Sequence, residues 1–175
     1  MSEKRLFTLC QDFVANMNSK KYFISVCTMC VVLISEASVS KNIDTTIIPM
    51  QEKSARTFYV EAQLDGFGKS EFMVDTGSGY TVINEQTLES LKKSGKATYV
   101  KDLLGLLADG SEKRVPVYRL SSFSLSHNCE IYNIEVAIFP GSTRHILGLN
   151  TLRKMGAFEF SFAPPQLVFR QCGEA

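Results

Sequence analysis

The sequence is poor in the residues that build metal sites. Its 175 residues include no tryptophan, two histidines and five cysteines, and of these only Cys27 and Cys30 stand at the spacing of a zinc-ligand pair. A structural zinc ion takes four such ligands, usually as two close pairs, and no second pair lies near the first. We therefore expect neither a metal site nor a cofactor.

Charge of one sign is also scarce. The chain has 19 basic and 18 acidic residues, for a net charge of +1, whereas nucleic-acid-binding domains carry a strongly basic surface. No glycine-rich phosphate loop is present, because Gly66 and Gly68 read as a hairpin turn. We expect no nucleic-acid partner, and the length excludes an enzyme that needs two full lobes in one chain.

No apolar run is long enough for an ordinary membrane span. The longest, residues 22–35, is about 14 residues, against roughly 18 for a span. Two lysines precede it and small residues follow it, which is typical of a secretory signal peptide. We expect residues 1–37 to be a signal peptide cut after Ala37, with Met17 as the more natural start. An uncleaved membrane anchor and a buried core helix are the alternatives.

The leader changes how the rest of the chain is interpreted. An exported domain would be periplasmic or secreted, or held outside the cytoplasm by an anchor, and the membrane would be touched only through the N-terminal segment. Cleavage would leave only Cys129 and Cys172, which could pair in an oxidising compartment. Polar residues 38–54 are expected to form a linker or pro-segment, and residues 55–175 the domain.

The remaining chain is expected to be mostly β. Apolar and polar residues alternate over 57–64, turn residues follow, and apolar residues resume at 71–74, a pattern that predicts a hairpin. Short helices are predicted from Asn84 to Gly95 and from Asn150 to Met155, the first with an asparagine cap. Further strands are predicted at 97–107, 115–125, 131–139, 158–162 and 167–170.

Asp75 is the candidate catalytic carboxylate of the sequence. Asp75 follows the apolar strand that ends at Val74 and precedes Thr76, Gly77 and Ser78. Glycine lets the backbone approach the carboxylate, so that nearby amides can donate to it. The alternative is that Asp75 merely caps a β-turn, because Asp-Thr-Gly alone is a weak motif.

Two motifs in order make the pattern specific. Residues 72–78 read Phe-Met-Val-Asp-Thr-Gly-Ser, with Tyr-Thr-Val-Ile at 80–83, and His-Ile-Leu-Gly-Leu follows at 145–149, about 70 residues after Asp75. Together they resemble the retropepsin-like aspartic proteases, the single-lobe relatives of pepsin. The resemblance covers residues 57–170 and implies an acid-protease barrel, all-β with two short helices and one lobe per chain.

The resemblance also implies roles for individual residues. Asp75 would be catalytic, Thr76 would bond across a dimer, Gly77 would donate its amide to the carboxylate, and Ser78 would bond the outer carboxylate oxygen. A strand through Ile146, Leu147 and Gly148 would pass beside residues 75–78, which we call the catalytic loop. Ala108, Asp109 and Gly110 would form the tip of a substrate-covering flap, for which an ordinary hairpin is the alternative.

The chemistry of this family needs two aspartates, and the sequence has no second Asp-Thr/Ser-Gly. A homodimer that brings Asp75 to its symmetry mate would supply the pair. In such dimers terminal strands interleave, and residues 167–170 and the segment before Phe58 are the candidates here. We expect an aspartic endopeptidase that hydrolyses peptides as a homodimer. The alternative is a catalytically silent retropepsin-like module for peptide binding or dimerisation.

Overall fold

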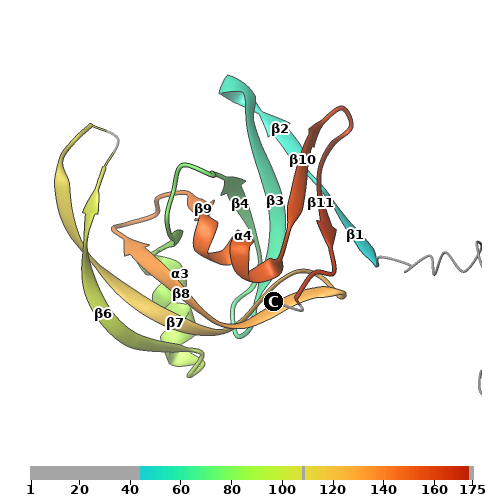
Figure 1. The fold of residues 1–175 in the computed structure, drawn as a ribbon. Helices are drawn as coiled ribbons and strands as arrows, with labels where there is room; N and C mark the ends of the chain where they lie inside the picture. The colour runs from blue at the N-terminus through green and yellow to red at the C-terminus, as the bar shows by residue number, and fades with distance from the viewer. Residues whose placement is uncertain (1–43, 108, 174–175) are drawn as a thin grey trace, which may run out of the picture. The chain divides into compact units, whose positions relative to one another are not determined.

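The computed structural model describes residues 44–107 and 109–173 (Figure 1). The predicted signal peptide and Ala108 of the predicted flap lie outside them. No helix in these residues is long and apolar enough to cross a membrane. The described part contains two α-helices, a 3-10 turn and eleven strands: β1 (Thr45–Pro49), β2 (Gln51–Lys53), η1 (Ser54–Arg56), β3 (Thr57–Leu64), β4 (Gly68–Val74), β5 (Thr81–Asn84), α3 (Glu85–Lys93), β6 (Ala97–Leu106), β7 (Glu112–Ser126), β8 (Cys129–Phe139), β9 (His145–Leu147), α4 (Leu149–Met155), β10 (Phe158–Phe162) and β11 (Pro165–Arg170).

The strands form two sheets. The larger has the order β2-β3-β4-β9-β5-β8-β7-β6, and a second pairing joins β3 to β7, which curls this sheet on itself. The smaller has the order β1-β11-β10. Most pairs are antiparallel, but β4 runs parallel to β9 and β5 parallel to β8. The predicted mostly β fold with two short helices is confirmed.

Alternation along the strands places the core. On β3, Val60, Ala62 and Leu64 are buried while Glu61 and Gln63 between them are exposed, as the period-two pattern predicted. The predicted hairpin of residues 57–74 is present as β3 and β4. The apolar face of this hairpin packs against side chains of the other strands. The rings of Phe72 on β4 and Phe123 on β7 pack edge to face, with their centroids 5.1 Å apart.

Both predicted helices are present. The side chain of Asn84 accepts a hydrogen bond of 2.8 Å from the Thr87 amide, so it caps α3 as expected. Lys92 and Lys93 lie in the last turn, where positive charge suits the helix dipole. The second helix, α4, begins directly after Gly148 and buries Leu152 and Met155 in the core.

The described part of the predicted linker or pro-segment, residues 38–54, contains two strands. Residues 45–53 form β1 and β2, with Ile48 of β1 opposite Leu167 of β11 and Glu52 of β2 opposite Phe58 of β3. Ile48 is 3% exposed and belongs to the core. These strands are short and include Pro49, so their local pattern resembled a polar arm. Pairing with β11, which is distant in the sequence, gives β1 its structure, and pairing with the nearby β3 gives β2 its own.

The smaller sheet also changes the expectation for the terminal strands. Strand β11 pairs with β1 on one side and β10 on the other, both in its own chain. An exchange of residues 167–170 with a second copy would therefore have to break an existing ladder. The edges of this sheet are β1 and β10.

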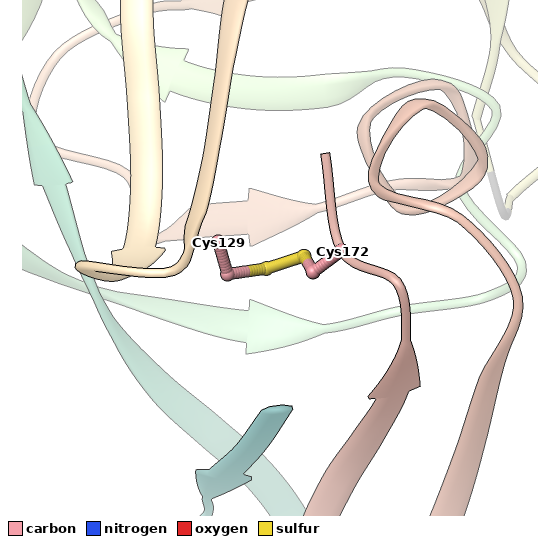
Figure 2. Close-up of a disulfide and its surroundings, with 2 residues drawn as sticks. All are labelled: Cys129 and Cys172. Atoms are coloured by element: carbon pink, nitrogen blue, oxygen red, sulfur yellow. A yellow bond between two sulfur atoms is a disulfide. The ribbon is translucent and has the colours of Figure 1, made fainter. Parts of the chain in front are cut away.

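A disulfide joins the C-terminal end of the domain to the β7–β8 turn. Cys129, at the start of β8, is bonded to Cys172, which follows β11, 43 positions away in the sequence (Figure 2). Cys129 is fully buried in the core. The bond therefore attaches the end of the smaller sheet to the β7–β8 turn of the larger one.

We predict that removing this disulfide weakens the fold. Closing a loop of this length restricts the unfolded chain, so the variant Cys129→Ala/Cys172→Ala should lose about 4 kcal/mol of unfolding free energy in urea titrations. Reductant should lower the stability of the wild type by a similar amount and leave the double variant unchanged. Equal stability of the oxidised wild type and the double variant would contradict the prediction.

Candidate active site

Asp75 lies at the point where β4 leaves the sheet. Parallel pairing sets Val74 opposite Leu147 of β9, and the Asp75 amide donates to the Leu147 carbonyl at 3.1 Å. The strand and its neighbour thus fix the backbone on the N-terminal side of the carboxylate. Asp75 itself is half-buried, and Thr76 and Gly77 after it are exposed.

The carboxylate has one donor within the described chain. The Gly77 amide donates to Oδ1 of Asp75 at 2.9 Å, the contact expected from the motif. A further bond, from the Ser78 amide to the Asp75 carbonyl at 3.2 Å, closes the turn. Hydrogen bonds among residues 44–107 and 109–173 do not reach Oδ2, which leaves that oxygen open to water, substrate or a second copy.

Ser78 does not make the contact that the family resemblance implied. Its hydroxyl donates to the Tyr80 carbonyl at 2.7 Å, and a hydroxyl has only one proton to donate. The side chain therefore tightens the turn behind the catalytic loop instead of bonding the carboxylate. The exposed Thr76 hydroxyl has no hydrogen-bond partner in the described residues.

A second segment crosses directly beneath the catalytic loop. The amides of Leu149 and Asn150 donate to the carbonyls of Ser78 and Gly79, at 2.9 and 3.2 Å. Ile146, Leu147 and Gly148 therefore lie beside the loop. The crossing is so close that a Cβ on Gly148 would lie 2.3 Å from the carbonyl oxygen of Tyr80. Only glycine fits at this position.

Three polar residues that sequence reasoning missed hold this crossing together. The buried Thr81 hydroxyl lies 2.6 Å from that of Thr151 and accepts the Gly148 amide at 3.1 Å. Asn150 accepts the Thr81 amide at 2.7 Å and donates to the Glu135 carbonyl at 2.6 Å. Thr81 lies inside the first motif, and Asn150 and Thr151 directly follow the second; their polar side chains at these positions were the signal that the sequence offered.

His145 contacts side chains of β4 and α3 in the same region. At the start of β9 it is 8% exposed and stacks on Phe72, with ring centroids 4.9 Å apart. Its Nδ1 lies 2.8 Å from Ser70 Oγ and its Nε2 3.0 Å from Thr87 Oγ1. Burial lowers the pKa of His145, and a weaker opposing effect comes from a backbone hydrogen bond with Glu71.

The predicted flap is the β6–β7 hairpin. At its turn the Leu107 amide donates to the Ser111 carbonyl at 2.8 Å, and the Ser111 hydroxyl and amide donate to the Asp109 carboxylate at 2.6 and 2.9 Å. These bonds lower the pKa of Asp109. Gly110 has a φ of +81°, a left-handed conformation that suits glycine. The hairpin that we predict as the flap therefore carries polar, hydrogen-bonded residues at its turn.

An apolar surface connects the catalytic loop to the base of the flap. It is a small cluster separate from the main core, whose half-buried members come from the loop, β6, β8 and β9: Tyr80, Leu103, Phe139 and Ile146, around buried Val82, Val115 and Ala137. Such a partly exposed apolar surface beside a carboxylate suits apolar side chains of a bound chain. Groups of three or more His, Cys, Asp or Glu side chains that could hold a metal do not occur in the described part.

We predict that Gly148→Ala damages both stability and site. The added Cβ must push Tyr80 and Thr81 away, so the unfolding free energy should fall by about 3 kcal/mol, the upper end for overpacking. The matched control is Gly79→Ala in the same loop, where an added Cβ meets nothing within 4 Å. Equal urea midpoints for the two variants would refute the close crossing.

We predict that the free energy of unfolding depends on pH through His145. Its folded-state pKa lies below the unfolded value of about 6.5, so its contribution is complete above pH 6.5 and is lost as the pH falls through the folded pKa. His145→Gln cannot titrate. Between pH 7.5 and 4.5 the urea midpoint of the wild type should fall further than that of the variant. A constant difference between the two would rule out the effect.

Three comparisons relate this chain to known proteins. A family model described as aspartyl protease matches residues 60–151, which include Asp75 and the crossing segment. A solved structure, a retropepsin-like aspartic protease from Rickettsia conorii, is similar at 22% identity and a TM-score of 0.48, over 72% of this chain and 90% of that one. A search of curated proteins finds no match. Because the family model spans more than half of the 175 residues, the chain belongs to the aspartyl protease family, as its two motifs predicted.

Proposed function

We propose that the protein is an aspartic endopeptidase whose active site is assembled by a homodimer, with one Asp75 from each copy. The observation that carries this proposal is the catalytic loop itself. A single Asp-Thr-Gly sequence holds a half-buried carboxylate with one oxygen bonded by Gly77 and the other open. Because the backbone of this loop is fixed while one oxygen of the Asp75 carboxylate has no hydrogen bond within the described residues, the loop is suited to contact with a symmetry-related copy of the chain.

The chemistry follows from the pair. Two carboxylates about 3 Å apart cannot both be ionised, and the aspartic-protease dyad is the standard example of this effect. The ionised Asp75 takes a proton from a water, whose oxygen bonds to the scissile carbonyl carbon, while the protonated Asp75 donates its proton to the carbonyl oxygen. When the tetrahedral intermediate collapses, the Asp75 that took the water proton donates it to the amide nitrogen, and the carbon–nitrogen bond breaks. The other Asp75 takes a proton from a hydroxyl of the intermediate, so that a carboxylic acid and an amine leave and the pair again holds one proton.

The supporting residues have consistent places in this scheme. Thr76, exposed and without a partner in the described residues, is available to bond across the two-fold axis. An extended peptide would pair with the flap backbone and place apolar side chains on the surface that contains Tyr80, Leu103 and Ile146. This assigns apolar peptides as the substrate class.

The proposal includes export of the domain. The leader pattern of residues 1–37 supports it, and so does the disulfide between Cys129 and Cys172, since disulfides persist in oxidising compartments. The domain would then act in the periplasm or outside the cell, either free or anchored by its N-terminal segment.

The test is cleavage of a peptide library by the purified full chain between pH 4 and 7, followed by mass spectrometry. Asp75→Asn should reduce the rate at least about a thousandfold, because it removes the acid and base groups together. The specific activity of the wild type should fall on dilution below the dimer dissociation constant. Equal cleavage by both proteins would refute the assignment, and a dimer without turnover at any concentration would indicate a silent module.

A further inference from the structure

Charged side chains continue the apolar surface along β6, β7 and β8, which lie side by side in Figure 1. On β6 Lys101 lies two residues before Leu103, a member of that surface, and on β8 Glu135 lies two residues before Ala137, another member. Side chains two residues apart on a strand point to the same face, so Lys101 and Glu135 share the face of the apolar surface. Arg119 of β7 is opposite Glu135 in the β7–β8 ladder, which places it on this face as well.

These three residues, Lys101, Arg119 and Glu135, contact one another, and we call them the charged trio. Lys101 Nζ and Arg119 Nη2 each lie 3.3 Å from a different oxygen of the Glu135 carboxylate. Lys101 Nζ also lies 5.9 Å from the centre of the Tyr80 ring, which belongs to the apolar surface. The Glu135 carbonyl accepts the Asn150 side-chain amide at 2.6 Å. The charged trio is therefore attached both to the apolar surface and to the segment that crosses beneath the catalytic loop.

The charged trio has a surplus of one positive charge. One carboxylate meets two cations, and each of its oxygens already contacts one of them. The side chains of Lys101 and Arg119 are each 49% exposed, whereas that of Glu135 is 28% exposed. A guanidinium has five N–H donors and an ammonium has three, so the contacts with Glu135 use only part of them. A second carboxylate on the exposed side of the two cations would balance their charge.

We propose that the charged trio binds an acidic side chain, Asp or Glu, of the peptide substrate. This inference rests on the proposed function and deepens it, because it adds a charged residue to the apolar residues already assigned to the substrate. A peptide that covers the apolar surface at Tyr80 passes beside Lys101. Charge-assisted hydrogen bonds from an ammonium or a guanidinium to a carboxylate are among the strongest polar contacts. In a homodimer each copy would contribute one trio, so an acidic residue would be favoured on both sides of the scissile bond.

The test is a set of peptides with one apolar sequence, in which Glu, Gln or Lys is placed in turn at each position around the cleavage site. The wild-type full chain should cleave the best Glu peptide with a kcat/KM at least about fivefold above that of its Gln counterpart, and the Lys counterpart should be the poorest. Lys101→Met and Arg119→Met should each reduce this preference, and the double variant should abolish it. Lys101→Arg, which keeps the charge, should retain it.

The matched control is Arg114→Met on the same hairpin. Arg114 precedes Val115, a member of the apolar surface, so its side chain points to the opposite face of β7, where it lies 3.9 Å from Asp102. This variant should keep the ratio of Glu to Gln cleavage within about twofold of the wild type. A purely structural role of the charged trio would change the urea midpoint of Lys101→Met but not that ratio.

The outcomes separate this inference from the proposed function. Equal cleavage of Glu and Gln peptides by the wild type at every position would overturn the inference while the proposed function stands, and this comparison needs no variant to fold. A Glu preference that survives in the double variant, or one that Arg114→Met lowers as much as Lys101→Met, would also overturn it. If the chain cleaves no peptide, the proposed function fails, and fluorescence anisotropy with the same peptides decides the inference. Binding of Glu peptides at least about fivefold tighter than of Gln peptides would then support it, and equal or absent binding would overturn it.

Discussion

The close crossing of two chain segments beneath Asp75 is the constraint on which the rest of the structure depends. Gly148 passes so near the Tyr80 carbonyl that a single added carbon would not fit. Thr81 and Asn150 bond the two segments from the sides. The larger sheet brings β4, β9 and β5 together at this point, so the position of the carboxylate is fixed by backbone atoms from regions distant in the sequence. A loop held in this way keeps its shape while its outer side remains open.

Local sequence patterns predicted most of the strands and both helices because each carries its own periodicity or cap. The alternation before Leu64 and the Asn84 cap needed no tertiary information. Residues 45–53 were missed because their strand character comes from pairing with β11 and β3. The partner of Ser78 was not predictable for a related reason, since its hydroxyl donates to the Tyr80 carbonyl and the motif alone does not say which acceptor the fold provides. Motif spacing located Asp75, but the bonds of Thr81, Asn150 and Thr151 depend on a crossing that spacing alone does not describe.

The smaller sheet connects the ends of the domain to the site. Strands β1 and β10 flank β11, and Cys172 attaches the end of β11 to the turn before β8. Phe160 and Phe162 on β10 in turn contact Phe58, which lies next to the strand of Asp75. The disulfide therefore stabilises a sheet that stands beside the catalytic loop. The disulfide therefore contributes to the geometry of the candidate site as well as to the stability of the domain.

In the proposed dimer, the charge of the catalytic pair would be set by assembly, because the hydrogen bonds of one chain reach only one carboxylate oxygen of Asp75. Gly77 is the only donor to the Asp75 carboxylate within the described residues, because the Ser78 hydroxyl is already used by Tyr80. The remaining partners must then come from water, substrate or a second copy. When two such carboxylates approach, their mutual repulsion keeps one proton between them. Under the proposed function, the catalytic acid and the catalytic base would therefore come from the two copies of Asp75 and exist only in the dimer.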